Sequence, residues 1–276
     1  MVLSAIRRSA SWVMRMGTVV SRAAASKLPM VGALFWAIKI VATTLGESVS
    51  NFVSMTPLHL GYAAAAVVFL VAFGLTLTVQ LRIDRFQPVV FWSVILTTSI
   101  AGTAMSDFMN RTAGLGYAGG AAVLTGLLIA VLVGWRLTGQ TMDVERIDTT
   151  QGEILYWTAT LVSNTLGTSS GDFLSNGLGL GFRDSALLLS GAMLLILAAH
   201  YLTAVSGTVL FWAAYVLTRP LGAVAENAVE KPVVQGGLGV GTTITSGALL
   251  AVLMVLVGYQ LLSNDGQTRT VEDTVL

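Results

Sequence analysis

The chain of 276 residues contains no cysteine, two histidines, five prolines and only 11% charged residues. Without cysteine it has no disulfide framework and no thiolate site for a metal or for redox chemistry. The two histidines, His59 and His200, lie outside the repeated motif described below, which disfavours a zinc or copper centre. The scarcity of charge, with 54% hydrophobic residues and a mean hydropathy of +0.78, argues against a soluble domain and favours a membrane protein.

Long charge-free runs occupy most of the sequence, and a helix that crosses a bilayer needs about 20 mostly apolar residues. We therefore predict an all-α polytopic membrane protein with eight transmembrane helices. They are expected near 34–54, 62–81, 90–110, 117–136, 155–175, 185–203, 208–228 and 241–262. An N-terminal segment over 1–33, basic and amphipathic or disordered, precedes this membrane domain of 34–262, and a polar C-terminal tail follows over 263–276.

An internal repeat divides the predicted membrane domain. The pattern W-x9-G occurs four times, at Trp36/Gly46, Trp92/Gly102, Trp157/Gly167 and Trp212/Gly222. The first and third tryptophans are 121 residues apart and the second and fourth 120 apart, which indicates halves of about 34–153 and 154–262. Each half is expected to hold two helical hairpins. Because four spans are an even number, the two pseudo-symmetric halves should be parallel in the membrane.

The basic residues indicate how the chain is oriented. By the positive-inside tendency both termini are expected in the cytoplasm of a bacterium, with the protein in the inner membrane and the lipid bilayer as its partner. The net charge of +1 gives no indication of a nucleic-acid partner, and a homo-oligomer is left open. Ten of the fifteen basic residues fall on one side of the predicted topology, namely Arg7, Arg8, Arg15, Arg22, Lys27, Arg82, Arg85, Arg136, Arg146 and Arg269.

Acidic side chains follow each motif glycine inside otherwise apolar sequence. An ionisable group at that depth in lipid costs about 2.5 to 3.5 kcal/mol, so we expect these acids to line one shared site within the protein. Carboxylate and amide oxygens suit hard cations such as Mn²⁺, and buried carboxylates can also carry protons. The predicted metal ligands are Glu47, Asn51, Asp107, Asp172, Glu226 and Asn227.

Two basic residues inside the predicted spans support alternative interpretations. Arg219 lies too deep to reach the interface easily, so it can form a structural ion-pair network or bind an anion. Lys39, three residues after Trp36, is expected to extend its amine to the membrane interface. The four motif tryptophans are interpreted mainly as interface anchors.

No enzyme constellation is found in the sequence. A Ser-His-Asp arrangement would need a histidine near a motif serine, and GLGLG at 177–181 follows a helix instead of a strand, unlike a nucleotide-binding motif. The two equivalent aspartates, Asp107 and Asp172, lack the flanking YD and GxGD signatures of intramembrane aspartyl proteases. We therefore expect neither catalysis nor a bound cofactor.

The repeated motifs resemble a family of bacterial repeat-containing integral membrane proteins of largely unassigned function. The resemblance covers most of the chain, and LTRPLGA at 217–223 is its most specific element. It implies an eight-helix membrane fold and no particular substrate. Members commonly carry GExxxD in the first repeat and an aspartate at the end of the fourth, where this chain has Asn51 and Asn227. The matching segments are FWAIKIVATTLGES at 35–48, FWSVILTTSIAGTAMSDF at 91–108, YWTATLVSNTLGTSSGDF at 156–173 and FWAAYVLTRPLGAVAEN at 211–227.

From the residues we expect a transporter that moves a divalent cation of the manganese type, exports it and couples its movement to protons. The alternatives are an anion carrier centred on Arg219 and a membrane scaffold in which the acids only pair with that arginine.

Overall fold

The computed structural model describes residues 28–55 and 57–275, with side chains described as far as Ser263. The prediction of an all-α fold is confirmed for these residues, which form eight long α-helices. Most of the predicted N-terminal segment lies outside the described residues. The helices are α2 (Ala33–Ser54), α3 (Tyr62–Arg82), α4 (Pro88–Asp107), α5 (Gly116–Leu137), α6 (Thr150–Asp172), α7 (Gly181–Leu202), α8 (Gly207–Glu230) and α9 (Thr242–Val275).

Local sequence explains where several of these helices begin and end. Pro88 stands in the first turn of α4, where its missing N–H leaves no hydrogen bond unmade. Gly61, with a φ of 82°, precedes α3 in a backbone conformation that side-chain-bearing residues rarely adopt. The helices α4 and α6 each continue into one π-helical turn, η1 (Phe108–Thr112) and η3 (Phe173–Gly177), directly after Asp107 and Asp172.

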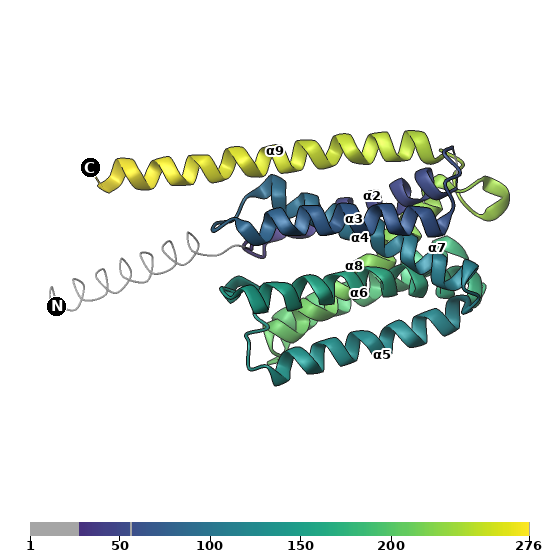
Figure 1. The fold of residues 1–276 in the computed structure, drawn as a ribbon, viewed down its shortest axis with the longest axis horizontal. Coiled ribbons are helices and arrows are strands. Elements are labelled where there is room, and N and C mark those ends of the chain that lie inside the picture. The colour runs from purple at the N-terminus through teal and green to yellow at the C-terminus, as the bar shows by residue number, and fades with distance from the viewer. Residues whose placement is uncertain (1–27, 56, 276) are drawn as a thin grey trace.

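The four motif helices form an inner ring. Helix α2 packs on α4, α4 on α6, α6 on α8, and α8 returns to α2. The other four helices pack outside this ring, with α3 on α4, α5 on α6, α7 on α8 and α9 on α2. Figure 1 shows that the successive helices alternate in direction, so the inner helices run parallel to one another.

The two helices of each predicted hairpin do not pack chiefly against each other. Each outer helix packs chiefly against the inner helix of the following repeat, and α9 packs against α2 of the first repeat. The contact between α2 and α9 therefore joins the two ends of the repeat array, and the halves interlock around a closed ring.

Burial separates the inner from the outer helices. The outer helices expose many large apolar side chains, for example Leu75 of α3, Leu127 of α5 and Leu195 of α7, as lipid-facing helices do. Six described helices, α3, α4, α5, α7, α8 and α9, are long and apolar enough to cross a membrane. The inner helices α2 and α6 fall short of that criterion because they carry more polar residues, most of which they bury.

The ring has two chemically different ends. The motif tryptophans lie within the first eight residues of α2, α4, α6 and α8. We call this end of the ring, where α2 begins and α9 terminates in Figure 1, the tryptophan end. At the opposite end, called the loop end, lie the connections 55–61, 113–115, 178–180 and 231–241. Helix α9 continues to Val275, so that residues 263–275, predicted as a polar tail, extend the last helix.

Aromatic side chains close the ring at the tryptophan end. The aromatic residue that precedes each motif tryptophan contacts the tryptophan of the next repeat. Trp92, Trp157 and Trp212 are buried, so their predicted role as interface anchors is wrong, because the ring packs each of them against an aromatic residue of the preceding repeat. The ring-centroid distances are 5.6 Å for Phe35–Trp92, 5.5 Å for Phe91–Trp157, 6.1 Å for Tyr156–Trp212 and 5.7 Å for Phe211–Trp36.

Candidate functional site

The motif glycines hold the inner helices close together. Each glycine packs against the residue that stands three positions before the glycine of the next repeat. A Cβ added at Gly46 would lie 2.5 Å from the Ser99 Cβ, nearer than real Cβ contacts occur. The four contacts are Gly46 with Ser99, Gly102 with Asn164, Gly167 with Arg219, and Gly222 with Thr43. The polar residues that directly follow the first three glycines, Glu47, Thr103 and Thr168, therefore meet inside the ring.

Arg219 and Glu47 form a buried ion pair at this level. The Nη2 atom of Arg219 lies 3.2 Å from Oε2 of Glu47, and both side chains are almost fully buried. Thr103 and Thr168 donate to the same Glu47 oxygen, at 3.0 and 3.2 Å. One side chain from each inner helix thus contributes to the centre of the ring.

The remaining contacts of Arg219 are also within the protein. Its Nη1 donates to the carbonyl of Thr43 at 3.0 Å, and its Nη2 also contacts the carbonyl of Ser99 and the Thr103 hydroxyl. Only Nε has no acceptor among the described residues. Because its donors meet protein oxygens on two other inner helices, the guanidinium links α8 to α2 and α4.

Lys39 does not reach the membrane interface. Its side chain is 1% exposed, and its amine donates to the hydroxyl of Thr218 at 2.9 Å and lies 3.8 Å from the Tyr215 ring centroid. The expectation that Lys39 extends to the interface is therefore wrong. The reason is that Lys39 faces α8 inside the ring, where a hydroxyl and an aromatic face can accommodate the amine.

Asp107 and Asp172 both form ion pairs with Arg111. The Arg111 Nε lies 2.8 Å from Asp107, and its Nη2 lies 3.6 Å from Asp172. Both aspartates are buried, whereas the arginine side chain is 36% exposed at the loop end. The π turns that follow both aspartates place this group where α4 and α6 reach the loop end, and such turns often occur at functional sites.

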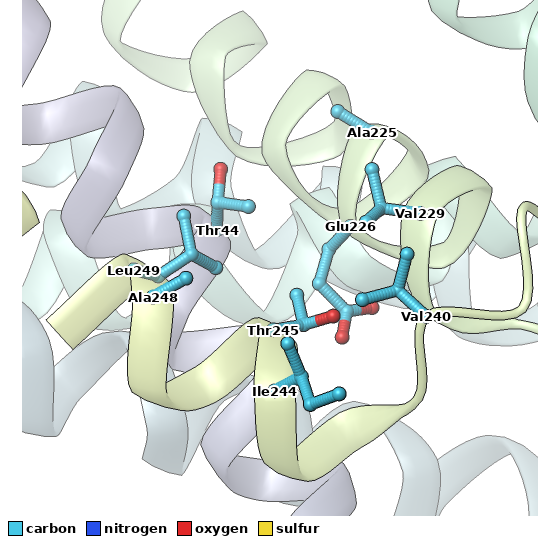
Figure 2. Close-up of a pocket in the computed structure, with 9 residues that line it drawn as sticks. All are labelled: Thr44, Ala225, Glu226, Val229, Val240, Ile244, Thr245, Ala248 and Leu249. Carbon is cyan, nitrogen blue, oxygen red and sulfur yellow. The ribbon is translucent and has the colours of Figure 1, made fainter.

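Glu226 occupies a separate position beside α9. It lines a cavity of about 270 Å³ between α2, α8 and α9, shown in Figure 2. One helical turn later, Glu230 lies 3.4 Å from the Ser48 hydroxyl of α2 and 3.6 Å from the Lys231 amine. The Ser48 hydroxyl also contacts Ser246 of α9 at 2.7 Å, so this group joins the first and fourth repeats.

The two predicted amide ligands, Asn51 and Asn227, are buried near the loop end. The side-chain amide of Asn227 donates to the backbone carbonyl of Ala223 at 3.0 Å, so this hydrogen bond lies within its own helix. The Nδ2 of Asn51 has no acceptor among the described residues. Their assignment as metal ligands stays a prediction.

The structure divides the one shared site that we expected into three groups. Glu47 pairs with Arg219, Asp107 and Asp172 pair with Arg111, and Glu226 lies with Glu230. Within the described part of the chain, no three His, Asp or Glu side chains converge closely enough to hold a metal ion. The division has a geometric cause, because equivalent residues of the four repeats face different corners of the ring and the acids stand at different distances from their glycines.

Three charged residues of these groups were not among the predicted site residues. Arg111 and Lys231 lie outside the predicted helices, although Arg111 follows Asp107 by four residues and therefore lies on the same helical face. Glu230 follows Glu226 at the same spacing, so the sequence contained a signal for that pair. The partnership of Glu47 with Arg219 could not be read in this way, because it depends on how the ring closes.

Comparison with known families identifies the repeat. A family model described as Repeat of Unknown Function (DUF347) matches residues 34–86, 90–141, 155–206 and 210–265. Neither the curated proteins nor the solved structures gave a match to the chain. The matched segments contain one inner and one outer helix each, in agreement with the four repeats of W-x9-G and with the expected family. Since these matches cover well over half of its length, the chain belongs to the family of proteins built from this repeat of unknown function.

Proposed function

We propose that this protein is a membrane transporter for a hard divalent cation of the manganese type, which it exports in exchange for protons. In this proposal all eight helices cross the inner membrane of a bacterium, with the tryptophan end and both termini in the cytoplasm. The buried carboxylates of the inner ring supply the cation with oxygen ligands as it moves toward the loop end.

An excess of buried negative charge supports the proposal. Between the motif glycines and the loop end, five carboxylates are buried, namely Glu47, Asp107, Asp172, Glu226 and Glu230. The basic groups paired with them are Arg219, Arg111 and Lys231. Two carboxylates therefore exceed the paired basic groups, and either one divalent cation or two protons would balance them. This charge balance is the observation on which the proposed function rests.

Helices α2 and α6 can cross the membrane in this proposal although they are more polar than the other helices. Both belong to the inner ring, and α6 buries most of its polar residues, including Thr160, Ser163 and Asn164. Outer helices α5 and α9 cover their outward faces. A polar helix surrounded by apolar helices avoids the cost of placing its hydroxyls and amides in lipid.

The two alternatives differ in how well they fit the contacts of Arg219. An anion carrier centred on Arg219 is disfavoured, because the guanidinium already meets Glu47 and two backbone carbonyls. A scaffold with a structural acid and arginine network is favoured by that same buried pair. For Asp107 and Asp172 the scaffold is less favoured, since their shared partner Arg111 is partly exposed and can move away.

The test is the thermal stability of the purified protein in detergent with Mn²⁺, Mg²⁺, Ca²⁺, Co²⁺, Zn²⁺ or simple anions. A ligand that binds only the folded state at 100 times its Kd stabilises it by about 2.7 kcal/mol. We expect Mn²⁺ to raise the Tm of the wild type and to have no such effect on Asp107→Asn/Asp172→Asn. The matched control is Asp148→Asn/Asp184→Asn, which changes two exposed aspartates.

Transport itself is then measured in liposomes with the cation that binds. A folded Asp107→Asn/Asp172→Asn protein that moves Mn²⁺ at the wild-type rate would refute the assigned site. A protein that loses stability on the same substitutions and binds no cation in any state would instead be the scaffold.

A further inference from the structure

The chain that joins α8 to α9 closes one end of the cavity between α2, α8 and α9. The backbone N–H groups of Val240 and Gly241 donate to the carbonyls of Val229 and Glu230, each at 3.2 Å. These hydrogen bonds satisfy two of the last carbonyls of α8 and hold Val240 in the cavity wall. The cavity is therefore a fixed feature of the fourth repeat and not a gap left by loose packing.

Apolar side chains form most of the cavity wall. Val229, Ile244 and Leu249 line a volume of about 270 Å³, which is just below the range of about 300–1,000 Å³ that small-molecule pockets commonly have. At the outer rim, Ile244 is 66% exposed and Val240 is 38% exposed. The cavity therefore opens outward between α8 and α9, among exposed apolar side chains, and has room for a small molecule.

Among the described lining residues, Glu226 is the only ionisable one, and it has no donor. It is 1% exposed, and neither of its carboxyl oxygens receives a hydrogen bond from the described part of the chain. Figure 2 shows its side chain extending from α8 toward Thr245 of α9. Glu230, one turn later on α8, is directed to the Ser48 hydroxyl and the Lys231 amine. Because a buried carboxylate without a donor is costly, a positive partner would stabilise Glu226.

The two hydroxyl groups in the cavity wall do not donate to Glu226. Thr44 donates to the carbonyl of Ile40 at 2.8 Å, and Thr245 donates to the carbonyl of Gly241 at 2.9 Å. The described residues of the wall thus offer hydrogen-bond acceptors, namely the carboxyl oxygens and the hydroxyl lone pairs, and no available side-chain donor. A molecule that carries positive charge and N–H groups complements such a cavity, whereas an anion does not.

A hard metal ion fits this cavity poorly. Such ions take about six to eight oxygen ligands in proteins, and the cavity wall supplies one carboxylate and two threonine hydroxyls. The apolar side chains around them cannot hold the waters that would complete the coordination shell. A primary ammonium group has only three N–H donors to satisfy, and the carbon body attached to it can contact Val229, Ile244 and Leu249.

We propose that this cavity binds a small apolar amine, whose ammonium group pairs with the Glu226 carboxylate and whose carbon body fills the space between α8 and α9. The site lies apart from Asp107 and Asp172, which belong to the group around Arg111. Because α9 packs against α2 and closes the array of repeats, the bound amine lies where the first and fourth repeats meet. The inference does not rest on the proposed transport of a hard divalent cation.

Direct binding of tritiated phenethylamine to the purified full-length protein in detergent tests the proposal. This probe combines a primary ammonium with a small aromatic body. Two unlabelled competitors separate the contributions, since phenethyl alcohol has the same body without the charge and ethanolamine has the ammonium without the body. We expect each to displace the probe at least about tenfold more weakly than unlabelled phenethylamine does, because one lacks the charged hydrogen bonds and the other the apolar contact. Equal displacement by the alcohol would overturn the proposal.

Two substitutions in the cavity wall, each with a matched control, locate the site. Glu226→Gln keeps the size of the side chain and removes its charge, so binding should weaken by at least about tenfold. Its control is Asp184→Asn, which removes an exposed acid of α7. Ala248→Phe fills the cavity and should abolish binding, whereas Ala251→Phe changes an exposed residue of the same helix outside the cavity. Wild-type affinity in a folded Glu226→Gln or Ala248→Phe protein would contradict the assigned site.

Photolabelling of the wild type tests the site even where a substituted protein fails to fold. The protein is irradiated with an aryl azide derivative of phenethylamine, and the adducts are mapped by peptide mass spectrometry. We expect adducts on α8 and α9 near Val229 and Ile244 that disappear with an excess of unlabelled phenethylamine. Adducts that spread over α3, α5 and α7, or that persist in the excess, would mean that the probe only partitions into the detergent, and the proposal would fail.

Measurements with Mn²⁺ separate this site from the proposed function. If phenethylamine binds at Glu226 and no divalent cation raises the Tm, the amine site stands and the cation transporter fails. If Mn²⁺ raises the Tm of the wild type but phenethylamine does not bind, the cation transporter is supported and the amine site is overturned.

Discussion

The Glu47 carboxylate of the first repeat and the Arg219 guanidinium of the fourth lie 3.2 Å apart at the centre of the inner ring. Residues equivalent to Arg219 in the other repeats are Thr43, Ser99 and Asn164, so this charge occurs at one corner only. The ion pair therefore breaks the fourfold repetition where the chain ends of the array meet. It connects α2 to α8 in addition to their packing contact.

Arg219→Gln should destabilise the protein strongly. Removing one partner of a buried ion pair leaves the other charge buried and uncompensated, which typically costs about 3–5 kcal/mol. We expect a lower Tm in detergent and partial recovery in the double variant Arg219→Gln/Glu47→Gln, in which neither charge remains. Fluorescence-detected size-exclusion chromatography after heating measures the Tm of the single and of the double variant. The anion-carrier hypothesis predicts otherwise, namely a folded Arg219→Gln protein without transport and little effect of Glu47→Gln.

A second prediction follows from the close packing of the inner helices at the motif glycines. A Cβ at Gly102 would lie 2.8 Å from Asn164 Cβ and 2.9 Å from the Thr165 backbone nitrogen, neither of which is a flexible side-chain end. Gly102→Ala should therefore separate α4 from α6 and lower stability by about 1–3 kcal/mol. The control is Gly191→Ala on α7, where no atom lies within 4 Å of an added Cβ. Equal melting temperatures of the two variants would contradict the ring geometry.

Arg111 provides a third prediction, because it occupies the space between the two aspartates that are assigned to the cation. Arg111→Gln removes the competing positive charge from Asp107 and Asp172. We expect a larger increase in Tm at a given Mn²⁺ concentration than in the wild type, together with slower release and slower flux in liposomes. Arg146→Gln, which removes an exposed arginine from its contact with Asp143, is the control. A weaker Mn²⁺ response in Arg111→Gln would show that the arginine does not compete with the cation.

The helices were predictable because their signals are local. Apolar runs of about 20 residues separated by glycine-rich turns predict a helix at 62–81, and the observed α3 is Tyr62–Arg82. Helix α7 begins at Gly181, four residues before the predicted start at 185. The depth of each acid along its helix also follows from its distance to the motif glycine. These inferences need only helical rise and periodicity.

The grouping of the acids was not predictable in the same way. Whether Glu47 meets Asp107 or Arg219 depends on the order of helices around the ring, which helical periodicity does not specify. The burial of Lys39 has the same origin, since its partners Tyr215 and Thr218 lie far away in sequence. The aromatic cluster was misjudged because a tryptophan at a helix start has the same sequence signature at a lipid interface and inside a ring of parallel helices.

The proposed topology can be tested cleanly because the chain has no native cysteine. Single cysteines replace Asp148, exposed in the loop at the tryptophan end, and Val234, which is 93% exposed at the loop end. If all eight helices span and the tryptophan end is cytoplasmic, a membrane-impermeant maleimide should label Val234→Cys in intact cells. Asp148→Cys should be labelled only after the membrane is permeabilised. Labelling of both positions from outside would mean that one of the three helices between them, α6, α7 or α8, does not span, and the more polar α6 would be the first candidate. The reversed pattern would mean either that α2 does not span or that both termini lie outside. In the second case the direction in which the carboxylates deliver the cation would be reversed.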